Sequence, residues 1–404
     1  MNLTDLVRII NGRTKISYID ETINFIKLDS REISEGDIFI CINSGTNYID
    51  NAVNNKARAI ITDKEINRND VLVIHVNNII DTLGYIGKYL RNIYKGKVIA
   101  ITGSNGKTTT KELIYHILSS KYNVLKNVES ENNNIGVPKT LLMLDNEYDY
   151  LVIELGMNHL GEIEYLSKMI EPDIGIITNI GTAHIGNLGS KENIFLAKSE
   201  LLLGNPNMRL YINGEDKYLK RLNGINVLIK DYDGIFKSNH CPIDYVLAVK
   251  VCEDLGFSLK EIKEQLKTFK LPKSRMKEIN INNKIIIDDA YNASYESIIE
   301  ALESLRKYNG RKIIILGDML ELGSFSKDIH EDIISIIKKQ TNTLLFTLGE
   351  ITRKIDCSNN FIDLEEIKNF FKNFSFFKGD VIYLKSSNKM KLYTIVPYFE
   401  ELLK

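Results

Sequence analysis

The sequence contains no tryptophan, six prolines and four cysteines among 404 residues. The cysteines, at positions 41, 241, 252 and 357, form no C-x-x-C pair, which argues against a zinc site or a disulfide framework and predicts a reducing compartment, the cytoplasm. The chain start has no signal-peptide core, and no apolar run approaches the roughly 20 residues that cross a bilayer. The net charge is −1, so no overall field attracts nucleic acid or a membrane surface. Any anionic ligand must therefore be held by a local site.

The length of the chain predicts more than one domain, because single hydrophobic cores stop growing at about 250–300 residues. Apolar residues make up 44% of the chain and charged residues 26%, as in ordinary globular proteins. Short apolar runs alternate with helical patterns, which predicts an α/β fold with mainly parallel sheets. The pattern restarts twice, so we expect three domains, at residues 1–95, 96–271 and 272–404.

A phosphate-binding loop is predicted at residues 101–112, ITGSNGKTTTKE, which follow a buried-strand pattern and precede an amphipathic helix. The start of such a helix attracts anions, because its backbone N–H groups are unpaired and its dipole is positive there. Gly103 and Gly106 allow the backbone to approach phosphate, Lys107 can reach the terminal phosphates, and Thr108 can ligate Mg²⁺. The usual loop has a further glycine five residues before Gly106, which this chain lacks. The pattern still predicts a nucleotide site.

The motif TGSNGKTTT resembles the ATP loop of the Mur peptide ligases and the folylpolyglutamate synthases, in which this loop is shorter than in other phosphate-loop proteins. Further similar segments follow in the family's order: NNNIGVPKTLL at 132–142, ELGMNHLGEI at 154–163, ITNIGTAHIGNLGS at 177–190, AKSELL at 197–202, DDAYNAS at 288–294 and LGDMLELGSFSKDIH at 316–330. The N-terminal LDSREISEGDIFICI at 28–42 and the GDMLELG stretch favour the Mur ligases over the folate enzymes.

The resemblance implies an ATP-dependent amide ligase that works through an acyl phosphate. The most similar branch of the family adds D-alanyl-D-alanine to a UDP-N-acetylmuramoyl tripeptide in peptidoglycan precursor synthesis. The implied architecture is a small α/β N-terminal substrate domain, a central doubly wound phosphate-loop domain and a C-terminal Rossmann-like α/β domain. The implied partners are small molecules, namely a UDP-muramoyl peptide and D-Ala-D-Ala or another amine, and the implied state is a monomer.

Transfer of a phosphoryl group to a carboxylate needs charge stabilisation and close positioning of both partners. The resemblance makes Lys107, Glu154, His184 and Lys198 catalytic, and makes Thr108, Glu154, His184 and Lys198 the residues that hold Mg²⁺. Glu154 ends an apolar strand, and ligands of α/β sheets bind at that edge. Lys198 is implied to be carbamylated by CO₂, which requires a neutral amine and hence a lowered pKa. Without the resemblance, a helical lysine is usually solvated.

The resemblance also implies two recognition sets. The nucleotide set comprises Gly103, Ser104, Asn105, Gly106, Lys107, Thr108, Thr109, His240, Asp244, Arg275 and Asp289. The substrate set comprises Ser30, Arg31, Asn132, Asn133, Tyr291 and Asn292. An arginine suits a diphosphate, although the DSR stretch at 29–31 also fits a salt-bridged turn.

Several residues depart from the family pattern at positions that the resemblance assigns to the recognition of adenine and substrate. Asp244 stands where the family has an asparagine that contacts adenine, and it can accept a hydrogen bond from the adenine amino group but cannot donate to a ring nitrogen. Ser130 replaces an asparagine, Asn388 replaces an arginine, and the segment 214–240 is short. These departures leave open a family member that joins another acid and amine. A non-catalytic nucleotide-binding scaffold is the third reading, and the retained catalytic positions argue against it.

Overall fold

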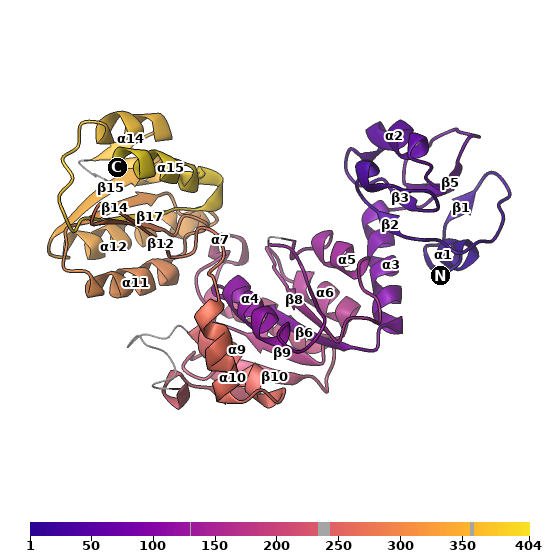
Figure 1. Ribbon diagram of the computed structural model, residues 1–404, viewed down its shortest axis with the longest axis horizontal. Coiled ribbons are helices and arrows are strands. Elements are labelled where there is room, and N and C mark those ends of the chain that lie inside the picture. Colours follow the sequence, from indigo (N-terminus) through magenta and orange to yellow (C-terminus); the bar gives the residue numbers. More distant parts are fainter. Residues whose placement is uncertain (130, 233–242, 356–358) are drawn as a thin grey trace.

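The computed structural model describes residues 1–129, 131–232, 243–355 and 359–404. Three mainly parallel sheets of five, six and six strands follow one another along the chain (Figure 1). This arrangement confirms the predicted α/β class with three sheet-bearing modules. The predicted domain limits, 95/96 and 271/272, each fall between the last strand of one sheet and the first strand of the next, and they stay a prediction. No helix in the described part of the chain is long and apolar enough to span a membrane.

The N-terminal sheet has the order β1-β5-β4-β3-β2, with only β1 antiparallel to its neighbour. Its strands are β1 (Arg13–Thr14), β2 (Ile26–Lys27), β3 (Ile38–Ile40), β4 (Ala59–Thr62) and β5 (Leu72–His75), and its helices are α1 (Leu3–Ile9), α2 (Ile49–Asn54) and α3 (Ile79–Ile93). The sequence pattern predicts a strand over residues 23–33, but only β2 forms there. Asp29 accepts a hydrogen bond from the Arg31 N–H, and this local bond favours a turn over a strand.

The central sheet is parallel throughout, in the order β11-β10-β9-β6-β8-β7. Its strands are β6 (Lys97–Thr102), β7 (Val124–Lys126), β8 (Tyr150–Glu154), β9 (Ile174–Ile177), β10 (Arg209–Asn213) and β11 (Ile225–Val227). Its helices are α4 (Lys107–Leu118), α5 (Gly136–Leu141), α6 (Glu162–Ile170), α7 (Ile185–Leu188), α8 (Lys191–Ser199), α9 (Ile243–Asp254) and α10 (Leu259–Thr268). The helix predicted after the phosphate loop is α4, and its Leu113, Ile117 and Leu118 are fully buried in one apolar cluster with α9.

The C-terminal sheet has the order β12-β13-β17-β14-β15-β16. Its strands are β12 (Lys277–Ile281), β13 (Lys284–Asp288), β14 (Lys312–Gly317), β15 (Thr343–Leu348), β16 (Asn360–Phe361) and β17 (Val381–Lys385), and its helices are α11 (Tyr295–Ser304), α12 (Ser326–Lys338), α13 (Glu350–Arg353), α14 (Leu364–Phe371) and α15 (Val396–Leu402). The edge strand β12 is antiparallel to β13. The turn between them consists of Asn282 and Asn283, with φ of 47° and 60°, which is the backbone that a tight hairpin requires.

The role of His330 is clear from its contacts. Its imidazole is fully buried on α12, where Nε2 accepts a hydrogen bond from the Met319 N–H at 2.9 Å and Nδ1 lies 2.6 Å from the Ser326 carbonyl oxygen. These partners define a neutral ring with its proton on Nδ1. Burial lowers the pKa of His330, which agrees with that form. His330 therefore fixes the loop after β14 to α12.

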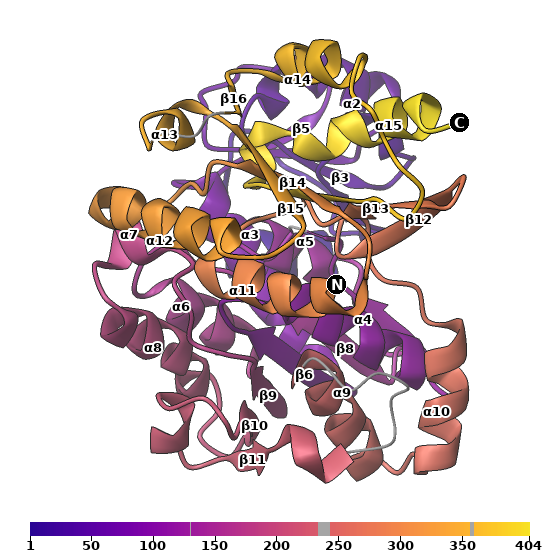
Figure 2. The ribbon, with the colours of Figure 1, turned by 90° about the vertical axis from the view of Figure 1, so that its left-hand side faces the viewer.

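The central and C-terminal modules lie against each other, whereas the N-terminal sheet is far from the C-terminal one (Figure 1). In the second view, α11 and α12 face the central module and α14 and α15 cover the other side of the C-terminal sheet (Figure 2). Arg275, in the segment that precedes β12, contacts Thr108 at the start of α4.

Candidate active site

Three loops at the carboxyl edge of the central sheet build the site. They follow β6, β8 and β9, and β6 lies between the other two strands. Gly103 and Gly106 have φ of 149° and 79°, a region that favours glycine. A Cβ on Gly103 would lie 1.8 Å from the Thr178 hydroxyl oxygen, so the loop is packed too tightly there for any side chain. The predicted phosphate loop and its glycine requirement are both present in the fold.

The loop after β9 supports the phosphate loop through hydrogen bonds. The Ser104 and Asn105 N–H groups donate to the Asn179 backbone and side-chain oxygens, both at 3.0 Å. In return, the Gly181 N–H donates to the Ser104 hydroxyl oxygen at 2.8 Å. The shape of the nucleotide loop is therefore set in part by residues 179–181.

The Thr108 hydroxyl joins two predicted site residues. It donates to Glu154 Oε2 at 2.7 Å and accepts from Arg275 Nη2 at 2.8 Å. Asn132 Nδ2 donates to the other Glu154 oxygen at 2.8 Å. Burial opposes ionisation of Glu154, but Lys107, Lys111 and the two hydrogen bonds outweigh it and lower its pKa. The result is a buried carboxylate beside the start of α4.

Three lysines surround this carboxylate. Lys107 Nζ donates to the Gly103 carbonyl oxygen at 2.9 Å, which joins the two ends of the loop. Lys198 is 1% exposed, and burial together with the charge of Lys107 lowers its pKa well below the ordinary value, although Glu154 opposes the shift. The third lysine, Lys111, was not predicted; it is fully buried and donates to the Asn127 carbonyl oxygen at 2.7 Å. Its position on the apolar face of α4, four residues after Lys107, was the available signal.

His184 lies at the start of α7 with φ of 65°, and its Nδ1 is 2.9 Å from Glu321 Oε2 of the C-terminal module. This contact lowers the pKa of Glu321. In the described part of the chain, no three His, Cys, Asp or Glu side chains converge on a metal-sized site. The structure thus brings Thr108, Glu154 and Lys198 into one neighbourhood and turns His184 towards Glu321.

Asp244 lies in the first turn of α9 against the phosphate loop. A Cβ on Gly106 would be 3.1 Å from the Asp244 Cβ. Burial, then the charge of Glu300, raises the pKa of Asp244 to about 7, against a partly compensating hydrogen bond with Thr109. Asp244 therefore meets the loop at the place predicted for the nucleotide. The predicted His240 and the departure Ser130 lie outside the described residues.

The predicted C-terminal residues divide into two groups. Arg275 stacks on the Tyr291 ring, 4.1 Å from its centroid, and its Nη2 donates to the Thr108 hydroxyl oxygen. Asp289 is buried and accepts hydrogen bonds from Lys385 at 2.6 Å and Tyr383 at 2.9 Å, so its carboxylate is occupied within its own module. Asn292 is exposed.

The predicted substrate residues are not assembled at one place. Arg31 is 80% exposed in its side chain and binds Asp29 at 2.6 Å, which is the salt-bridged turn that the sequence allowed. Ser30 is buried beside it in the N-terminal module, and the sheet of that module lies apart from α4 (Figure 1). Asn133 accepts hydrogen bonds from two N–H groups at the start of α5. Their roles towards a substrate stay predictions.

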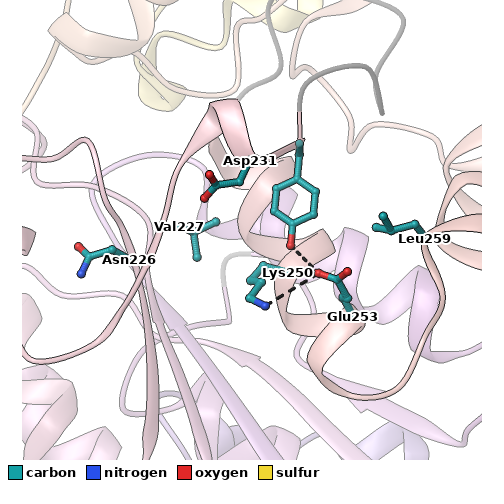
Figure 3. A pocket seen from close by; sticks show the side chains of 7 residues that line it. Asn226, Val227, Asp231, Lys250, Glu253 and Leu259 are labelled. Atoms are coloured by element: carbon teal, nitrogen blue, oxygen red, sulfur yellow. Dashed lines mark hydrogen bonds and ion pairs between the residues drawn. The ribbon is translucent and has the colours of Figure 1, made fainter.

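Two cavities lie beside α4 and α9, the two helices that pack together next to the phosphate loop. One of about 300 Å³ reaches Thr108 and carries the charged side chains of Glu112, Lys126, Glu129 and Lys270. The other, of about 200 Å³, lies between β11 and α9 (Figure 3). There the Tyr232 hydroxyl donates to Glu253 at 2.7 Å. No predicted site residue lines the second cavity, so the first is the one connected to the candidate site.

The fold and the site define a class of protein: a multi-domain α/β nucleotide-binding enzyme in which the C-terminal module reaches the phosphate loop. The comparisons then identify the family. The Mur ligase middle domain matches residues 101–231, and the Mur ligase, glutamate ligase domain matches residues 274–387. The UDP-N-acetylmuramoyl-tripeptide--D-alanyl-D-alanine ligase of Buchnera aphidicola subsp. Acyrthosiphon pisum is 32% identical over 452 aligned residues, which cover 100% of this chain and 98% of the relative. The chain belongs to the Mur ligase family and is an ATP-dependent ligase.

Other relatives agree in sequence and in structure. The Bacillus subtilis ligase of the same name is 29% identical, over 94% of this chain and 93% of the relative. A crystal structure of MurF from Acinetobacter baumannii has a TM-score of 0.86 and 27% identity and covers 98% of both chains. MurF from Thermotoga maritima, solved with ADP, shares the fold with a TM-score of 0.82 at 24% identity, over 94% of this chain and 97% of that one.

Proposed function

We propose that this ligase uses ATP to add D-alanyl-D-alanine to a UDP-N-acetylmuramoyl tripeptide. The names of its relatives give the two joined molecules for them, and MurF from Thermotoga maritima was solved with ADP. The observation that carries the proposal is the Thr108 hydroxyl, which contacts both Glu154 and Arg275 at the end of the phosphate loop. A carboxylate and an arginine beside the first turn of α4 support a site for Mg²⁺ and the terminal phosphates of a nucleotide. We also propose that the protein is a monomer and that it acts in the cytoplasm.

In the proposed reaction, a carboxylate oxygen of the peptide attacks the γ-phosphorus of ATP, and the bond to the β,γ-bridging oxygen breaks to release ADP. The amine nitrogen of the dipeptide then attacks the acyl carbon and loses a proton. Inorganic phosphate leaves with one oxygen of the original carboxylate. Lys107 and Arg275 supply positive charge to the phosphoryl oxygens, once Lys107 leaves the Gly103 carbonyl and Arg275 leaves the Thr108 hydroxyl.

The residues present fit a Mg²⁺ ion with few protein ligands, because the Thr108 hydroxyl and the Glu154 carboxylate lie in contact and both are oxygen ligands. When bound, Mg²⁺ would neutralise charge on the phosphoryl group. His184 would complete the set after leaving Glu321. Lys198 fits a carbamate, because its buried amine has a strongly lowered pKa, and a neutral amine is the form that reacts with CO₂.

The test is an isotope experiment with a matched variant. The peptide substrate carries ¹⁸O in its terminal carboxyl group, and the protein is supplied with ATP, Mg²⁺ and D-Ala-D-Ala. We expect one ¹⁸O atom in each released phosphate. Lys107→Ala should lower phosphate release by about 10³-fold or more, because its charge acts on the transition state. Release of unlabelled phosphate, or a Lys107→Ala rate within tenfold of the wild type, would refute the mechanism.

A second candidate function is a ligase of the same family that joins a different acid and amine. Asp244, and Asn388 in the turn after β17, are the observations that favour it, because both depart from the pattern around recognition. A matrix of UDP-muramoyl peptides against amino acids and dipeptides, measured by phosphate release, separates the two. The first candidate requires D-Ala-D-Ala to exceed every other amine in kcat/KM.

A further inference from the structure

The first turn of α11 lies directly on the phosphate loop. The Ser294 hydroxyl, which caps this helix, donates to Asn105 Oδ1 at 2.8 Å. Ser294 belongs to the C-terminal module, and Asn105 lies between the two glycines of the nucleotide loop. Placement of the C-terminal module and the shape of the nucleotide loop are therefore linked by a direct hydrogen bond.

Glu296, two residues further on, binds the loop after β9. Its Oε2 accepts hydrogen bonds from the Thr182 N–H at 2.9 Å and the Thr182 hydroxyl at 2.8 Å, and its Oε1 pairs with Lys191 at 2.8 Å. Burial alone would raise the pKa of Glu296, but Lys191 and the Thr182 N–H outweigh it and lower the pKa. The side chain is thus an ionised carboxylate, and both of its oxygens bind residues of the central module.

Gly181 connects this carboxylate to the nucleotide loop. A Cβ at Gly181 would lie 2.8 Å from Glu296 Oε2 on one side and 3.2 Å from the Ser104 Cβ on the other. The Gly181 N–H also donates to the Ser104 hydroxyl oxygen. Gly181 is therefore packed between Glu296 and Ser104. A shift of Glu296 would displace Gly181 and, through its hydrogen bond to Ser104, the nucleotide loop.

We propose that Glu296 is a positioning residue for the nucleotide, which sets the loop 178–182 and through it Ser104 and Asn105. The inference rests on the proposed use of ATP at this loop. Glu296 acts on the bound ground state of the nucleotide, so its loss weakens nucleotide binding more than it slows phosphoryl transfer. The C-terminal module thereby contributes to nucleotide affinity through Glu296 and Ser294.

The test measures ADP binding by titration calorimetry in the presence of Mg²⁺, which requires neither acid nor amine. Glu296→Ala should raise the Kd of ADP about tenfold, and Glu296→Gln, which still accepts from Thr182, should raise it about threefold. The control is Glu303→Ala on the same helix, where Glu303 forms an ion pair with Arg306 three residues on, and it should stay within twofold. The thermal midpoint of Glu296→Ala should stay within about 3 °C of the wild type.

A second variant distinguishes a loss of nucleotide binding from a folding defect. Thr182→Val keeps the N–H and removes the hydroxyl, so it should raise the Kd about threefold and add little to Glu296→Ala in a double-mutant cycle. Additive effects in the cycle, or Glu296→Ala within twofold of the wild type, would overturn the inference while ADP binding by the wild type stands. A wild-type protein that binds no ADP would instead refute the proposed function as well.

Discussion

Lys198 is the residue whose chemistry departs most from its ordinary behaviour. Its amine is buried, and the nearby charges of Lys107 and Glu154 act on it in opposite directions. We predict that Lys198→Ala lowers kcat at least 100-fold and that millimolar acetate or formate restores part of it, because a small carboxylate can occupy the place of the carbamate. The exposed Lys220→Ala is the control.

A spectroscopic signal separates the carbamate of Lys198 from a structural role. Protein equilibrated with ¹³C-bicarbonate should give a carbamate resonance that Lys198→Ala lacks. Absence of that resonance in the wild type, together with unchanged activity of the variant, would assign Lys198 a structural role only.

Asp244 gives a prediction of pH dependence. Its pKa is raised in the folded protein to about 7, so its favourable neutral form contributes to stability at low pH and that contribution is lost as the pH rises through 7. Asp244→Asn removes this titration. At pH 8 we expect the variant to melt several degrees above the wild type, which corresponds to at most a few kcal/mol in the free energy of unfolding. The difference should vanish near pH 4. Calorimetric scans across this range, with the exposed Asp328→Asn as control, provide the measurement.

The same residues show which parts of the site can be predicted. Lys107 and Thr108 begin the helix after β6, and Glu154 is the last residue of β8. The carboxyl end of a strand in a parallel sheet has a known place at the ligand-binding edge before any contact is known. Lys111 and Glu296 could not be assigned, because their partners come from distant segments: Asn127 for the first, and Thr182 and Lys191 for the second. Burial of a charge is decided by the tertiary packing, which the periodicity of one helix does not reveal.

At the scale of elements, the long apolar strands were predictable and the short mixed ones were not. Apolar runs predict strands at 97–102, 150–155 and 311–318, and β6, β8 and β14 end within one residue of these bounds, since each is mainly a run of buried aliphatic side chains. It does not predict β7, β11, β12 or β16, which have two to five residues and partly exposed side chains. Such strands exist because a neighbouring strand offers backbone hydrogen bonds, and that neighbour is known only after folding.

The loop after β14 gives a prediction at this scale. His330→Phe keeps an aromatic ring but leaves the buried Met319 N–H without its acceptor, which costs about 1–3 kcal/mol. The wild type should lose the same bond as the pH falls through the lowered pKa of His330, because a protonated ring cannot accept. Urea unfolding at pH 7.5 and at low pH should therefore show a smaller difference between variant and wild type in acid.

The exposed His159→Phe is the matched control for His330→Phe and should change the free energy of unfolding by less than about 0.5 kcal/mol. Equal stability of His330→Phe and the wild type at pH 7.5 would show that the loop does not depend on this histidine.

At the scale of the whole molecule, the central and C-terminal modules share one buried apolar cluster, and three polar contacts join them near the site. These contacts are Arg275 on Thr108, Glu321 on His184 and Glu296 on Thr182. Polar contacts of this kind permit domain movement more readily than large apolar ones. Two of the three contacts also involve residues proposed to hold Mg²⁺ or phosphate, so a nucleotide competes with them.

We therefore predict that the C-terminal module changes its position when nucleotide binds. Small-angle scattering of the wild type should differ between the free protein and the protein with Mg²⁺ and a non-hydrolysable ATP analogue, because Arg275 and His184 exchange protein partners for ligand ones. Glu321→Gln weakens the contact with His184 and should shift the free profile towards the bound one, whereas the control Glu303→Ala should leave it unchanged. Superimposable profiles with and without the analogue, at a concentration where calorimetry shows saturation, would mean that the nucleotide enters a site already closed. The contacts of Arg275 and His184 would then have to persist alongside the ligand.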